Sequence, residues 1–251
     1  MITTAIKEKC NSLKFNEKEQ KELLIKNSYT LRKLIGVLGI LLPVLLPLLL
    51  LFTDGFTEVL PSISHYYYTK SGPLFIAIMS LLAIFFIIYK EKCTDFIISS
   101  ITGMAALIVV LLPTDSLLQG CLNISENHIV TILEKNPTRE AFHYIAAGIF
   151  LFSLAYMSIF RFTIPSKGYE NAKKQLQLRH RLYRTLGIIM VFCLLIIFFG
   201  SDHFNKIVPN AFHTFYEDHH LTFWLETVAV ECFGISWLVK GGEFKLKSKT
   251  S

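Results

Sequence analysis

Six apolar blocks, each close to the length that a helix needs to cross a membrane, constrain this chain more than any other feature. The hydrocarbon core of a bilayer is about 30 Å thick and a helix rises about 1.5 Å per residue, so about 20 apolar residues span it. No block alternates apolar and polar residues as a membrane barrel strand does. The sequence therefore predicts an all-α fold, a polytopic membrane bundle of six transmembrane helices. Their approximate ranges are 34–52, 73–89, 96–112, 142–160, 182–199 and 221–239.

The composition excludes an ordinary soluble domain. Hydrophobic residues make up 52% of the chain and charged residues 18%, whereas soluble domains carry roughly 25% charge. The net charge of +6 lies mainly in the connectors beside the apolar blocks, where anionic lipid headgroups account for it. We therefore expect membrane lipids as partners and no nucleic acid.

The basic residues predict the orientation of the bundle. With six spans, 21 of the 25 Lys and Arg residues fall on one side, in the segments 1–33, 90–95, 161–184 and 240–251. Only Lys70, Lys135, Arg139 and Lys206 fall on the other side. Because basic residues concentrate in cytoplasmic loops, this asymmetry places both termini in the cytoplasm.

The first block follows some thirty mostly polar residues, whereas a signal peptide has its apolar region near the start. We therefore expect the first span to remain in the mature protein, in the cell membrane or, in a bacterium, the inner membrane. The predicted organisation is a basic cytoplasmic tail (1–31), a six-span membrane domain (32–240) and a cytoplasmic C-terminal tail (241–251). The tail 1–31 suits either an amphipathic helix on the inner leaflet or a solvated segment.

The connection between the first two spans, Leu60–Thr69 on the outer side, is the first candidate site. It carries serines, a histidine and three tyrosines directly after Pro61. These side chains suit an aromatic anchor at headgroup level, or a polar loop tucked between helix ends that contacts a lipid headgroup. On the second interpretation, the ligand-binding residues are Ser62, Ser64, His65 and Tyr67.

A set of histidines and aspartates at the outer helix ends is the second candidate. Imidazole and carboxylate groups are good zinc ligands, and zinc activates water against esters and amides. The spacing matches no established zinc motif, so solvated or hydrogen-bonded histidines are the alternative. The metal candidates are His65, Asp115, His143 and His203, and the wider set adds Asp202, His213, His219 and His220.

Two acids in the last span form the third candidate. A charged acid at the centre of a span costs about 2.5–3.5 kcal/mol, so Glu226 and Glu231 should face protein or water. Each suits either a carboxyl that bonds a neighbouring helix or a proton-handling group. We expect Glu226 to point into the bundle, towards spans two or four. With His143 and Asp115, it is a candidate catalytic residue.

The segment Leu60–Ser64, His143 at the start of span four, and Glu226 ahead of Phe233-Gly234 together resemble a known family. It is the family of the damage-regulated autophagy modulators (DRAM), which includes the Frag1 and Sfk1 proteins. The resemblance implies a six-span fold and a role in lipid biology, and it names no reaction. His65-Tyr66-Tyr67-Tyr68 stands here where the family has a short turn containing glycine.

Three classes of function remain open from the sequence. The leading one is a multi-pass membrane protein that binds, senses or organises lipid from its exoplasmic face without catalysis. The second is a membrane-embedded hydrolase or transferase, metal-dependent or not, that acts on a lipid through the outer His/Asp layer. The third is a small transporter that uses Glu226.

Overall fold

The computed structural model describes residues 17–89, 92–115, 128–164, 173–200 and 209–242. Within these ranges the chain is mainly helical, and its only β-type pairing is an isolated bridge between Thr69 and Ile129. The elements are α2 (Glu17–Asp54), the 3-10 helix η1 (Ile63–Tyr68), α3 (Gly72–Ile88), α4 (Cys93–Leu111), α5 (Pro137–Tyr156), the π-turn η4 (Met157–Arg161), α6 (Lys173–Gly200), α7 (Asn210–Asp218) and α8 (Leu221–Lys240).

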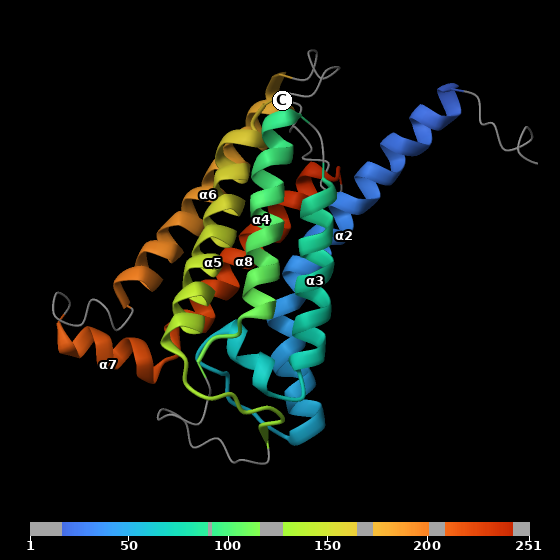
Figure 1. Ribbon diagram of the computed structural model, residues 1–251. Helices are drawn as coiled ribbons and strands as arrows, with labels where there is room; N and C mark the ends of the chain where they lie inside the picture. The colour runs from blue at the N-terminus through green and yellow to red at the C-terminus, as the bar shows by residue number, and fades with distance from the viewer. Residues whose placement is uncertain (1–16, 90–91, 116–127, 165–172, 201–208, 243–251) are drawn as a thin grey trace, which may run out of the picture.

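The long helices form a closed ring in which each packs against two neighbours, in the order α2, α3, α4, α5, α6 and α8 (Figure 1). Five of the helical segments are long and apolar enough to cross a membrane: Tyr29–Asp54, Cys93–Leu111, Pro137–Arg161, Leu176–Gly200 and Leu221–Lys240. The predicted all-α membrane bundle is thus confirmed in its helical, apolar character. The remaining apolar helix, α3, has only 17 residues.

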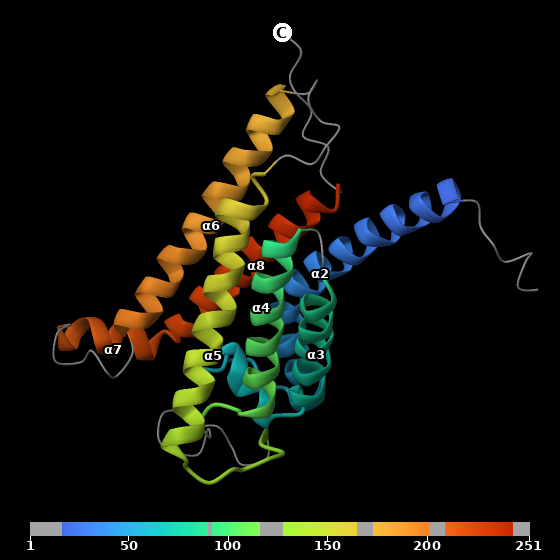
Figure 2. The ribbon, with the colours of Figure 1, turned by 45° about the horizontal axis from the view of Figure 1, so that its top comes forward.

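The first helix is longer than the apolar block that predicts it. α2 runs through 38 residues, crosses the expected boundary between tail and membrane domain, and contains Pro43 and Pro47 without a break. Its N-terminal part projects away from the other helices, and the helix changes direction as it joins them (Figures 1 and 2). The apolar block therefore marks only the part of α2 that packs in the ring.

Glycines bring the helices into close contact at several crossings. A Cβ added at Gly234 of α8 would lie 2.7 Å from the carbonyl oxygen of Gly36 in α2. A Cβ added at Gly103 of α4 would lie 2.7 Å from the carbonyl oxygen of Ala83 in α3. Backbones at this distance exclude any side chain, so glycine sets the spacing of both helix pairs.

The two ends of the bundle differ in character. At the end where α2 enters the ring, the indole of Trp237 is fully buried among aromatic rings from α3, α8 and the chain after η4. Beside it, Arg161 of η4 donates to the carboxylate of Asp95 in the first turn of α4. The opposite end carries η1, and α7 lies across the bundle there rather than along it (Figure 1). We call it the η1 end.

Candidate functional site

The connection between α2 and α3 folds back into the bundle instead of lying on its surface. Leu60, Tyr66 and Tyr68 are fully buried, and so is Ser71 at the start of α3. The Ser71 hydroxyl donates to the carbonyl oxygen of Leu46 at 2.7 Å. Leu46 precedes the end of α2 by eight residues, or about 12 Å of helix. η1 therefore lies beside the last two turns of α2, in the space that a longer α3 would occupy.

The carboxylate of Glu226 in α8 holds this connection in place. Its Oε2 accepts a hydrogen bond from the backbone N–H of Ile63, the first residue of η1, at 2.8 Å. The first N–H groups of a helix have no partner inside it, so a buried helix start needs such an acceptor. Glu226 points inwards, as expected. Its partner, however, is the loop between the first two spans rather than span two or four.

Three consecutive carbonyl groups after α4 accept hydrogen bonds from three side chains. The Leu112 oxygen accepts from His143 Nδ1 at 2.8 Å, the Pro113 oxygen from Arg139 Nε at 3.2 Å, and the Thr114 oxygen from the Tyr68 hydroxyl at 2.5 Å. His143 and Arg139 belong to α5, and Tyr68 belongs to η1. These bonds satisfy the carbonyls where a buried helix ends, and they join α4, α5 and η1.

His65 of η1 is a titratable group whose pKa is set by its surroundings. Its Nδ1 is 2.7 Å from the Ser62 hydroxyl oxygen, and the donor depends on the ring tautomer. Burial lowers the pKa of His65 to about 4, the charges of His143 and His220 also lower it, and Asp115 opposes them. The ring is therefore neutral at pH 7. The effect of His143, Asp115 and His220 on this pKa indicates that they lie in the neighbourhood of His65.

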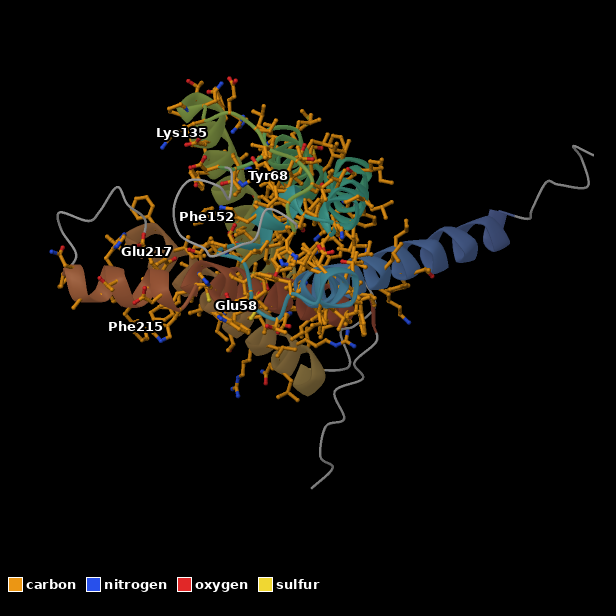
Figure 3. The ribbon with its side chains drawn as sticks, turned by 90° about the horizontal axis from the view of Figure 1, so that it is seen from below. Glu58, Tyr68, Lys135, Phe152, Phe215 and Glu217 are labelled. Carbon is orange, nitrogen blue, oxygen red and sulfur yellow. The ribbon has the colours of Figure 1, made fainter. Side chains whose placement is uncertain are left out.

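The segment 128–131 (the strap) lies alongside the end of η1. The backbone N–H of Val130 donates to the Tyr68 carbonyl oxygen at 2.8 Å. At the end of α2, Asp54 pairs with Lys70, and its Oδ2 lies 3.5 Å from Nδ1 of His128. Figure 3 looks onto this end, with Tyr68 among the helices and Lys135 at the outer edge beside α5. The strap and the ion pair fix η1 from the solvent side.

The structure gathers some of the predicted site residues and separates others. Ser62, His65, His143, Asp115 and Glu226 lie in one layer of the η1 end. Ser64 and Tyr67 are half-buried in the same connection, and the Tyr67 ring packs edge-on against that of Tyr68.

Two of the remaining predicted histidines, on or beside α7, have only local partners among the contacts described. His213 and His219 interact within α7 and its C-cap, with Glu217 and with the Phe215 carbonyl oxygen. His220, between α7 and α8, has a left-handed backbone with φ of 48°. His203 and Asp202 lie outside the described residues. Within the described ranges, no group of three or more His, Cys, Asp or Glu side chains is placed to hold a metal ion.

Thr114 and Arg139 belong to this layer but were not predicted as site residues, and Tyr68 was predicted only as part of the connection Leu60–Thr69. In the sequence, Tyr68 is one of three adjacent tyrosines. Only the hydrogen bond from its hydroxyl to Thr114 in the structure distinguishes it from the other two. Arg139 carried a usable signal, because it is one of only four basic residues on the predicted outer side.

Comparison with family models, with curated proteins and with solved structures finds no match for this chain.

Proposed function

We propose that this chain is a six-span integral membrane protein with both termini in the cytoplasm, and that its exoplasmic η1 end binds the headgroup of a membrane lipid. Five long apolar helices and the shorter α3, arranged in one ring, support the span count. The 21 basic residues on the opposite side support the orientation.

The observation that carries lipid binding is a polar connection held inside the end of a helical bundle. The hydroxyls and imidazole of η1 lie within about two helical turns of the end of α2, a depth that corresponds to the boundary between headgroups and acyl chains. Ser64, His65 and Tyr67 are half-buried, so a molecule in the outer leaflet can reach them. Glu226 and Tyr68 hold the connection rigid, which lowers the entropic cost of binding.

One contact favours a second candidate, a hydrolase or transferase acting on a lipid. The Ser62 hydroxyl lies 2.7 Å from a neutral imidazole, which is the distance between a nucleophile and its base in covalent catalysis. The same contact also suits a local cap, since Ser62 is the N-cap of η1 and His65 follows three residues later. The low pKa of His65 makes it a weak base, which favours the non-catalytic interpretation.

Native mass spectrometry of the protein purified in mild detergent tests the proposal. We expect bound phospholipid in the wild-type protein and weaker retention in His65→Ala and Tyr67→Ala. Glu58→Ala is the matched control, because Glu58 is exposed in the same connection. Equal retention in all variants, or none in the wild type, would contradict headgroup binding at η1. Zinc content and lipid turnover are measured on the same samples, and turnover lost in Ser62→Ala would select the enzyme.

A further inference from the structure

Arg139 is a basic residue in an unusual position. It lies in the first turn of α5, at the η1 end, where the predicted topology places few cations. Its Nε donates to the Pro113 carbonyl oxygen at 3.2 Å, so the guanidinium plane is fixed against the end of α4. Its charge also acts on the hydroxyl of Tyr68, whose pKa burial raises to about 12 and Arg139 lowers. The cation therefore lies within the polar layer around η1.

A second nitrogen of the Arg139 guanidinium group lacks a partner. Nη2 of Arg139 is buried and makes no hydrogen bond. Among the residues that the structure describes, no carboxylate forms an ion pair with Arg139, and the adjacent Glu140 accepts instead from the backbone N–H of Asn136 at 3.3 Å. A buried N–H of a permanent cation is costly to leave unpaired, so this position calls for an anionic acceptor.

The exposure of Arg139 and of its neighbour on α5 indicates the side from which an anion can reach the guanidinium group. Arg139 itself is half-buried, and Phe142, its neighbour one turn along α5, is 54% exposed, as a large apolar side chain that faces lipid on a spanning helix is. An acceptor beside the first turn of α5 therefore comes from the outer leaflet, at the depth of the lipid phosphates.

We propose that Arg139 binds the phosphate of a phospholipid headgroup, an inference that rests on the proposed function and names the chemical class it recognises. The planar guanidinium group offers two parallel N–H donors to two phosphate oxygens, which the ammonium of a lysine cannot do. The bond from Nε to Pro113 orients the group in advance. The uncharged polar groups of η1 would then contact the rest of the headgroup.

The test measures the thermal stability of the purified protein in dodecyl maltoside with three probes. These are dihexanoylphosphatidylcholine, dihexanoylglycerol (the same chains without phosphate), and inorganic phosphate. We expect saturable stabilisation by the phospholipid only. In Arg139→Gln the apparent Kd should rise about tenfold, the size of a lost charge-assisted hydrogen bond, and in Arg139→Lys it should rise less. Lys135→Gln removes an exposed charge nearby and should bind as the wild type does.

The outcomes separate this inference from the proposed function. Phospholipid binding that weakens in His65→Ala but not in Arg139→Gln would overturn the role of Arg139 and keep headgroup binding at η1. No phospholipid binding in any protein would overturn both. Stabilisation by inorganic phosphate as strong as by the phospholipid would overturn the lipid as the source of the anion. If Arg139→Gln does not fold, the Arg139→Lys comparison decides, and an unchanged Kd there contradicts bidentate phosphate binding.

Discussion

The backbone N–H of Ile63 and the Oε2 atom of Glu226 lie 2.8 Å apart, although 163 residues separate them along the chain. This bond joins the connection after the first helix to the last helix. An acid that lipid would penalise is thus used as an acceptor inside the protein.

Replacement of Glu226 tests that role. Glu226→Ala leaves the Ile63 N–H without an acceptor, which should cost about 1–3 kcal/mol of stability. Glu226→Gln keeps an amide oxygen as acceptor and should lose far less. Thermal unfolding and folded yield in detergent measure both effects. Equal losses in the two variants would contradict a packing role, and a well-folded Gln variant that loses proton-coupled flux in liposomes would favour the transporter.

The stability of the protein should fall in mild acid because of His65. The unfolded chain binds a proton near the ordinary pKa of 6.5, whereas folded His65 binds it only near 4. Between these values the unfolded state holds more protons, so stability is complete above pH 6.5 and declines as the pH falls towards 4. The comparison is Tm against pH for the wild type and His65→Gln. The wild-type curve should fall more steeply, and parallel curves would exclude this contribution.

The crossing of α2 and α8 depends on Gly234. In Gly234→Ala the new Cβ meets the Gly36 carbonyl oxygen at 2.7 Å, so the backbones must separate. We expect a loss of about 1–3 kcal/mol, typical of overpacking. Gly148→Ala in α5 is the matched control, because its Cβ would meet nothing within 4 Å. That variant should unfold at or above the wild-type temperature. A similar loss in both would show that helix spacing is not the cause.

The orientation can be tested with a membrane-impermeant maleimide on intact cells. Cys93 is exposed at the end opposite η1, and Glu58 is exposed at the η1 end. In a background with Cys10 and Cys121, which lie outside the described residues, changed to Ser, Cys93 should react only after permeabilisation. In the same background with Cys93→Ser, Glu58→Cys should react in intact cells. The reverse pattern would place the termini outside.

The helices could be predicted from the sequence because lipid solvation demands long apolar runs. Each predicted block coincides with one helix of the ring to within a residue at its end, except that the fourth block continues from α5 into η4. α7 was not predicted, since a nine-residue helix of mixed polar and apolar residues carries no such signal. The burial of η1 was also inaccessible. The N–H of its first residue, Ile63, and the carbonyl of its last, Tyr68, are satisfied by Glu226 and Val130, which are distant in sequence. A local pattern of serines and tyrosines cannot reveal those partners.

The short α3 has a consequence for the surrounding bilayer. Its 17 residues span about 26 Å, less than the roughly 30 Å of a hydrocarbon core, and such a mismatch usually thins the membrane locally. Here η1 fills the shortfall, and its groups are satisfied within the protein, as in the bond from the Thr69 hydroxyl to the Tyr66 carbonyl oxygen. In the proposed six-span arrangement the lipids beside α3 can therefore keep their normal thickness, because the protein itself supplies the missing depth.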